Sequence, residues 1–499
     1  QLSSIRLTYS GLITFALLLV SIITGLIFTL IVTRKLDQIE FGLWSLIGSV
    51  IAYSLIFAPI SNYWVKRHIA RGEEEAITGI ISALIFASGG IVIYFIATLF
   101  ISEFSDSDYH ILILAVMLVP FSYVLRSLNS IAGSYKPQVT AYSMLVFELT
   151  KIPLGYLLVY VADMGIEGAI LTSIFSHITQ IIFYLISLRK KLQGKFNVKT
   201  FRHWIKLSWL PVIGNIYDKI MYLDATIFTL ITGSVIGVAY VGISRVIGNV
   251  VSNTSAISIG LDPKLLATPN KKYVESMLDL TLLFAIPLFS FSIIFAKPGL
   301  WILNPIYVDA VSIVYLWSII HLIVVIYGIF TSALSGFERV DVGFKAGIKQ
   351  YLKSKLFSVP LVFVIGNSAY IIMLVLIFWQ SNQYQWNVID IVFWWGIIGI
   401  IYNAGILITF WRMLSKNISF EFPLKKTIKY ITSAIITSII SHMILTEYLV
   451  YEKEIMEFGP SIIPHILFFI GMYFGLMLLL DKEFRLLVKQ IFQELKKLS

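Results

Sequence analysis

The sequence contains no cysteine and has few charged residues. The absence of cysteine excludes disulfides, thiolate metal sites and cysteine nucleophiles. Charged residues make up 13% of the chain and hydrophobic residues 58%, whereas soluble proteins have about 25% and 45–50%. No Walker-type glycine loop, metal-ligand cluster or Ser/His/Asp arrangement occurs in the sequence. We therefore predict a protein that is not an enzyme, with no catalytic residues, no metal site and no cofactor.

Long apolar segments follow one another with only short polar gaps. A hydrocarbon layer about 30 Å thick requires about 20 apolar residues for each helical crossing. We therefore predict an all-α, polytopic membrane protein with about 14 transmembrane helices. The segments are 10–33, 42–65, 76–101, 110–131, 139–161, 166–188, 207–232, 238–261, 276–296, 310–334, 356–379, 390–412, 428–446 and 461–481. The first is too long for a signal peptide and is expected to be a permanent span.

The basic residues fall on alternate sides of these segments. Most of the 38 Lys and Arg residues lie at the N-terminus, after even-numbered segments or in the C-terminal tail. Arg126, at the end of the fourth segment, is counted among them as a cytoplasmic anchor. The gaps after odd-numbered segments contain only Arg34, Lys35, Lys297 and Lys453. The positive-inside rule then places both termini in the cytoplasm. The basic residues responsible for the net charge of +10 thus lie along one side of a membrane. We therefore expect a cell-membrane location and no nucleic-acid partner.

The most basic gap divides the chain into two predicted halves. Residues 1–188 form an N-terminal six-helix half, 189–206 a basic cytoplasmic linker and 207–414 a C-terminal six-helix half. Because six is even and both halves begin inside, we predict parallel pseudo-repeats with the substrate site between them. Residues 415–481 add two helices. Residues 482–499 form a cytoplasmic amphipathic tail, which lies either on the membrane surface or on the protein itself.

One charged turn and the helix after it carry a resemblance to a known family. Residues 34–47 read RKLDQIEFGLWSLI, and a basic exit, KRHIARGEEE, follows at 66–75. This unit resembles the start of the polysaccharide transporter group, the Wzx-like flippases of the multidrug/oligosaccharidyl-lipid/polysaccharide exporter superfamily. The opening of the second half, residues 207–246, is similar to the corresponding part of the family. The matching positions are Arg34, Leu36, Glu40, Phe41, Gly42, Trp44, Ser45, Pro211, Asp224, Gly233, Tyr240 and Arg245.

The sequence departs from the family at Ala239 and Val241, where Gly and Tyr are usual. The resemblance implies a flippase that moves a polyprenyl-(pyro)phosphate-linked oligosaccharide from the inner to the outer leaflet by alternating access, for polysaccharide or glycoconjugate biosynthesis. It implies the lipid-linked oligosaccharide and membrane lipids as partners. A glycan polymerase or transferase is a further candidate partner.

Three cations lie well inside the apolar segments, away from their ends: Lys151, Lys219 and Arg245. An ionised side chain at mid-membrane costs from about 2.5 to more than 10 kcal/mol, so such residues face protein or water. We hypothesise that these cations line a cavity between the halves and hold the phosphate of the lipid carrier. Phosphate suits this role because it offers several strong acceptors, of which Arg can bind two at once.

The alternative for these cations is ion pairing within the protein. Glu148 is three residues from Lys151, and Asp218 or Asp224 is available to Lys219 or Arg245. In the binding hypothesis, amides and aromatic rings would contact the glycan. These candidate contacts are Asn62, Tyr63, Asn215, Tyr217 and Tyr222.

Histidines in or near the spans admit two interpretations. His177, His321 and His442 are suited to proton relay, but a histidine that forms a hydrogen bond between helices is the more common arrangement.

Two other functions remain open from the sequence. A membrane glycosyltransferase would use an acidic pair such as Asp106 and Asp108, although a solvated acidic turn is the far more common origin of such a pair. A cation-coupled multidrug exporter of the same fold would require a carboxylate in the cavity of the first half. The first span, 11–33, contains none, and Glu148 is the candidate substitute.

Overall fold

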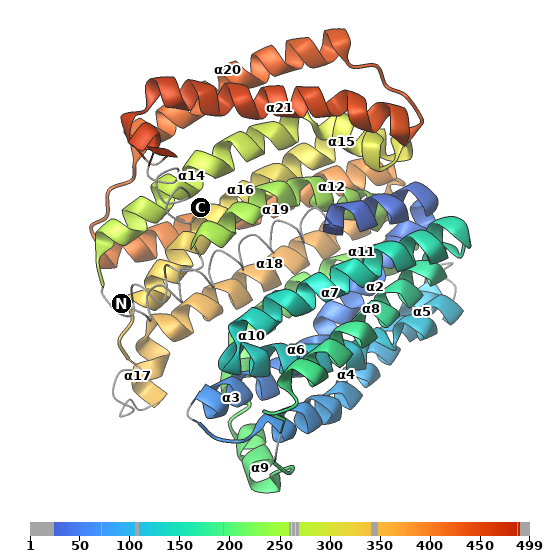
Figure 1. Cartoon of the computed structure of the whole chain (residues 1–499), viewed down its shortest axis with the longest axis vertical. Coiled ribbons are helices and arrows are strands. Elements are labelled where there is room, and N and C mark those ends of the chain that lie inside the picture. Colours follow the sequence, from blue (N-terminus) through green and yellow to red (C-terminus); the bar gives the residue numbers. More distant parts are fainter. Residues whose placement is uncertain are drawn as a thin grey trace. The chain divides into compact units, whose positions relative to one another are not determined.

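The computed structural model describes residues 24–70, 72–104, 109–192, 194–258, 261, 265, 269–340, 348–486 and 488–489. Within these ranges the regular structure is entirely helical, without a β-strand (Figure 1). Eleven helices in the described ranges are long and apolar enough to cross a membrane, and each coincides with one predicted segment. The predicted all-α polytopic fold is therefore confirmed.

The other three predicted segments differ from these eleven. Most of the first, 10–33, lies outside the described residues. The seventh is divided at Tyr222 into α10 (Trp209–Met221) and α11 (Leu223–Thr232). The eighth corresponds to α12 (Ile236–Ser252), which η3 (Asn253–Ser258) continues. The seventh predicted span is thus a broken helix rather than a continuous one.

The chain divides into two compact units, of which unit 1 comprises residues 1–242 and 363–391. The sequence-based division into six-helix halves stays a prediction. Besides α10, α11 and the start of α12, unit 1 contains α2 (Gln38–Ser54), η1 (Leu55–Phe57), α3 (Ala58–Ala70), α4 (Ala76–Phe104), α5 (Tyr109–Ala115), α6 (Leu118–Tyr135), α7 (Pro137–Gly155), η2 (Tyr156–Val161), α8 (Gly165–Leu188) and α9 (Val198–Lys206).

The charged turn before α2 determines where this helix begins. The Asp37 carboxylate accepts a hydrogen bond from the Glu40 N–H (2.8 Å), and the Glu40 carboxylate accepts one from the Asp37 N–H (3.2 Å). This reciprocal pair is a capping box, which satisfies two otherwise unpaired donors. Glu40 also accepts from the N–H of Ile166 (3.3 Å) in the first turn of α8. The acidic residues of the turn therefore join α2 to α8.

Gly42 allows α2 to lie unusually close to another segment of unit 1. A β-carbon at this position would lie 2.2 Å from the carbonyl oxygen of Val235, just before α12. Any larger side chain must therefore displace the backbone. The glycine of the FGLW sequence is explained by this close packing.

We expect Gly42→Ala to lower the free energy of unfolding by about 1–3 kcal/mol, because overpacking a tight contact forces the backbone apart. The midpoint of thermal unfolding in detergent measures the effect. Gly48→Ala is the matched control, because it lies in the same helix with nothing within 4 Å of the added carbon. Equal midpoints for the two variants would contradict the prediction.

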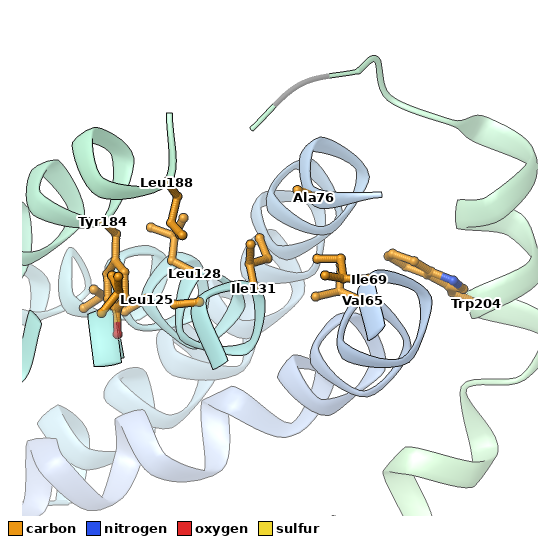
Figure 2. Packing of buried hydrophobic residues seen from close by; sticks show 11 residues of the cluster. Val65, Ile69, Ala76, Leu125, Leu128, Ile131, Tyr184, Leu188 and Trp204 are labelled. Atoms are coloured by element: carbon orange, nitrogen blue, oxygen red, sulfur yellow. The ribbon is translucent and has the colours of Figure 1, made fainter. Parts of the chain in front are cut away.

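Helix α9, from the predicted linker, is docked on α3 and α4. Trp204 is fully buried beside Val65 and Ile69 (Figure 2). Its indole N–H donates to Nε2 of His68 (3.3 Å). Close to the start of α9, the Glu75 carboxylate accepts from the side chains of Asn197 (3.1 Å) and Thr200 (2.8 Å). The linker therefore has a defined place in unit 1.

Unit 2 comprises residues 243–362 and 392–499. Its described helices, in addition to the rest of α12 and η3, are α14 (Lys271–Ile294), α15 (Ala296–Leu303), η4 (Pro305–Ala310), α16 (Val311–Gly336), α17 (Ile348–Lys353), the first part of α18 (Lys355–Gln383), most of α19 (Val388–Asn417), α20 (Leu424–Tyr448) and α21 (Ile455–Leu480). Of the two additional helices, α20 packs on α14 and on α21, and the hydroxyl of Tyr473 in α21 donates to the carbonyl of Leu283 in α14 (3.1 Å).

The beginning of the C-terminal tail packs on unit 2. Phe484 is buried in a cluster with Tyr430 and Met477. The carboxylate of Asp481 accepts from the N–H groups of Glu483 and Phe484 and pairs with Lys429 (3.2 Å). Burial alone would raise the pKa of Asp481, but these hydrogen bonds and the lysine charge lower it below its ordinary value. Polar and apolar contacts together hold the start of the tail on the protein.

Candidate functional site

Unit 1 has an open cavity of about 320 Å³ between α2, η1, α6 and α8. This volume is at the lower end of the range for ligand pockets. Most of the lining is apolar, and the polar side chains come from α6 and α8. The lining residues are Gly48, Ile51, Ala52, Leu55, Ser122, Leu125, Arg126 and His177. No carboxylate is among them.

Arg126 is the cation of this cavity. Helix α6 continues to Tyr135, so Arg126 lies nine residues before its end, which corresponds to about 13 Å along the helix axis. The fourth span therefore extends beyond the predicted end at residue 131, and the interpretation of Arg126 as a cytoplasmic anchor stays a prediction. Within the described part of the chain, its guanidinium forms neither a hydrogen bond nor an ion pair. Arg126 is exposed and lines the open cavity, so its donors are available to a ligand there.

His177 lines the same cavity from α8. Its ring centroid lies 5.1 Å from that of Phe147 on α7. Nδ1 of His177 is buried and has no hydrogen-bond partner among the described residues. The Phe147 ring also contacts Lys151, whose Nζ lies 4.9 Å from the ring centroid. The aromatic ring of Phe147 thus connects the lining of the cavity to the charges on α7.

Glu148 and Lys151 form an ion pair on α7. Nζ of Lys151 lies 3.0 Å from Oε2 of Glu148 and donates a hydrogen bond to Oε1 (3.2 Å). Both side chains are buried, with exposures of 6% for Glu148 and 12% for Lys151. A second ring, that of Phe28, also lies 4.9 Å from Nζ. The ion-pairing alternative from the sequence describes this geometry.

The other two predicted cations are each placed near an aromatic ring. Nζ of Lys219 lies 5.8 Å from the ring centroid of Tyr222, within unit 1. The guanidinium of Arg245 lies 4.6 Å from the ring centroid of Trp317, within unit 2. A cation over an aromatic face is attracted by the ring quadrupole. The role of these cations in phosphate binding stays a prediction.

The predicted polar partners have mostly local contacts. Asp224 is 1% exposed, and its carboxylate accepts from the N–H of Ala225 (2.7 Å). The amide of Asn215 donates to the carbonyl of Pro211 (2.8 Å). Asn62 is half-buried in α3. The side chains of Asp218 and Tyr217, and the pair Asp106 and Asp108, lie outside the described residues.

His321 forms a hydrogen bond between segments of unit 2. Its Nδ1 lies 2.6 Å from the hydroxyl of Ser252. A β-carbon at Gly248 would lie 2.8 Å from the His321 ring, so this glycine makes room for the imidazole. The interhelical role predicted for such histidines is observed here. His442 is exposed on α20.

No protein-family profile matches the chain, and no curated protein matches it. The lipid II flippase MurJ in an inward closed conformation is similar in structure, with a TM-score of 0.64 and 15% identity over 95% of this chain and 99% of that chain. An inward-facing multidrug resistance MATE family transporter of the MOP superfamily has a TM-score of 0.57 and 10% identity, over 81% of this chain and 98% of the transporter.

A third solved structure, the Vibrio cholerae MATE transporter VcmN in the bent form, has a TM-score of 0.51 and 13% identity, over 84% of this chain and all of VcmN. At such low sequence identity, the TM-scores show a shared fold and nothing further. The chain thus has the fold of known flippases and multidrug transporters, and the resemblance to Wzx-like proteins in particular stays a prediction.

Proposed function

We propose that this protein is a flippase, which moves a polyprenyl-(pyro)phosphate-linked oligosaccharide from the inner to the outer leaflet of the cell membrane by alternating access. The observation that carries the proposal is Arg126, a cation that has no partner among the described residues and lines a cavity without carboxylates. A cation inside a membrane protein is costly unless an anion or water meets it. A phosphate head group meets this requirement and accepts two guanidinium hydrogen bonds.

The phosphate contacts predicted from the sequence belong to the same proposal. We assign Lys151, Lys219 and Arg245 to later contacts with the phosphate, because aromatic faces stabilise each of them. Ser122 and His177 are suited to contact the sugar or the phosphate by hydrogen bonds. The two six-helix halves, both termini in the cytoplasm, and a downstream glycan polymerase or transferase belong to the same proposal.

A second candidate function is a cation-coupled multidrug exporter. Glu148 favours it, because this carboxylate is buried in unit 1 next to a single counter-ion. Proton binding by Glu148 would release Lys151, and an exporter needs such a coupling group. The similar MATE transporters support this candidate at the level of the fold.

Reconstitution in liposomes tests the proposal against this candidate. A polyprenyl-diphosphate disaccharide with a fluorophore on the sugar is placed in both leaflets, and dithionite is added outside. We expect the protein to allow bleaching beyond the outer-leaflet fraction, which protein-free liposomes do not allow. A cationic dye and an imposed pH gradient are tested in parallel liposomes. Dye transport without flipping of the lipid would overturn the proposal and favour the exporter.

A further inference from the structure

Helix α9 presents two different faces. One face is docked on unit 1 through Thr200 and Trp204. The opposite face carries Val198 and Ile205. The interval of seven residues places them on one side of the helix. They are 48% and 46% exposed, so α9 has an apolar ridge that the described part of the protein does not cover.

The ridge is bordered by positive charge. All seven basic residues from the end of α8 to the end of α9 are exposed, and none of them forms an ion pair within the described ranges. They are Arg189, Lys190, Lys191, Lys195, Lys199, Arg202 and Lys206. The nearby acid Glu75 is buried and already engaged by Asn197 and Thr200. The charge of this segment therefore faces outward.

The chain connections keep α9 near the ends of membrane-crossing helices. Helix α8, a candidate span, ends at Leu188. Helix α10, the start of the seventh predicted span, begins three residues after α9 ends at Lys206. Three residues reach at most about 10 Å. An exposed apolar ridge with cations on its border, at this level, is the pattern of a helix that lies in a membrane interface.

We propose that α9 binds anionic phospholipid head groups in the leaflet that it faces, with its apolar ridge in the interface and Lys199, Arg202 and Lys206 on the phosphates. Each such cation near an anionic surface favours binding by about fivefold. The short connections to the spans favour the protein's own membrane over an acidic protein as the occupant. The inference does not use the transported substrate and is independent of the proposed function.

The absence of cysteine allows a direct test on the chain of 499 residues. His203→Cys places the single thiol of the chain on exposed α9, and an environment-sensitive fluorophore is attached there. The labelled protein is reconstituted in phosphatidylcholine nanodiscs that contain a small fraction of acyl-brominated phosphatidylglycerol or, separately, acyl-brominated phosphatidylcholine. We expect the anionic lipid to quench about twofold more strongly at equal mole fraction, and high salt to remove the difference.

Two variants that each lose three positive charges distinguish a lipid site on α9 from nonspecific attraction between the basic protein and anionic lipid. Lys199→Gln/Arg202→Gln/Lys206→Gln is expected to equalise quenching by the two lipids. Lys482→Gln/Arg485→Gln/Lys489→Gln, in the exposed part of the tail, is expected to preserve the difference. Equal quenching by both lipids in the parent protein, or quenching by neither, would overturn the proposal. The salt dependence of the parent needs no variant, so the test holds if a variant does not fold.

Discussion

Replacing Arg126 with glutamine is expected to reduce flipping of the lipid-linked oligosaccharide by about 10- to 150-fold. The reason is the loss of charge-assisted hydrogen bonds to phosphate, each of which contributes about 1.5–3 kcal/mol. The guanidinium has no partner to lose among the described residues, so the fold should tolerate the change. The initial rate of dithionite-accessible fluorescence measures flipping, and thermal unfolding in detergent verifies the fold.

Two further variants test whether the loss of flipping is specific to the guanidinium of Arg126. Arg126→Lys is expected to retain part of the rate, because it keeps the charge but lacks the planar pair of donors. Lys66→Gln is the control, since it removes an exposed cation from α3 outside the cavity lining. If Arg126→Gln flips the lipid at the parent rate while Lys66→Gln behaves identically, Arg126 does not bind the head group.

The second large effect, a loss of folding stability, is expected for Lys151→Met. This change leaves the Glu148 carboxylate buried without its counter-ion. Removing one partner of a buried ion pair costs about 3–5 kcal/mol. The double variant Glu148→Gln/Lys151→Met removes both charges and is expected to recover most of this loss. Denaturant unfolding in detergent measures the four free energies of the cycle, those of the parent, Glu148→Gln, Lys151→Met and the double variant.

Two results of these stability measurements would contradict the expected effect of Lys151→Met. If Lys151→Met is as stable as the parent, or if the double variant is less stable than Lys151→Met, the pair does not stabilise unit 1. Flipping by the double variant adds functional information. Retained flipping would exclude both Lys151 as an essential phosphate ligand and Glu148 as an essential coupling group.

Much of the fold was predictable because hydropathy has the same physical cause as membrane insertion. Eleven predicted spans coincide with helices, since each needs only length and apolar side chains. The break at Tyr222 was not predictable in this way. Neither Pro nor Gly stands at the junction of α10 and α11, and an average over the segment hides an interruption of one residue.

The candidate site was only partly predictable. The spacing of Glu148 and Lys151 correctly indicated an ion pair as one alternative, because residues three apart are neighbours on a helix. Arg126 was interpreted as an anchor and not as a lining residue, since polar residues after Ile131 lower the hydropathy and suggest a loop. Pro137, which opens the next helix, was the better boundary signal. The proximity of Arg126 to His177 depends on packing between α6 and α8 and leaves no pattern in either segment.

The capping box of α2 gives the residues of this turn a structural role, so a family resemblance here is evidence for the fold rather than for the cargo. The carboxylates of Asp37 and Glu40 accept hydrogen bonds from the backbone at the start of α2, and Glu40 also accepts one from the amide of Ile166. Gly42 allows the close contact with Val235. Selection for correct assembly is sufficient to preserve such residues. Two chains with the same signature here are therefore expected to fold alike while differing in the cargo that they carry.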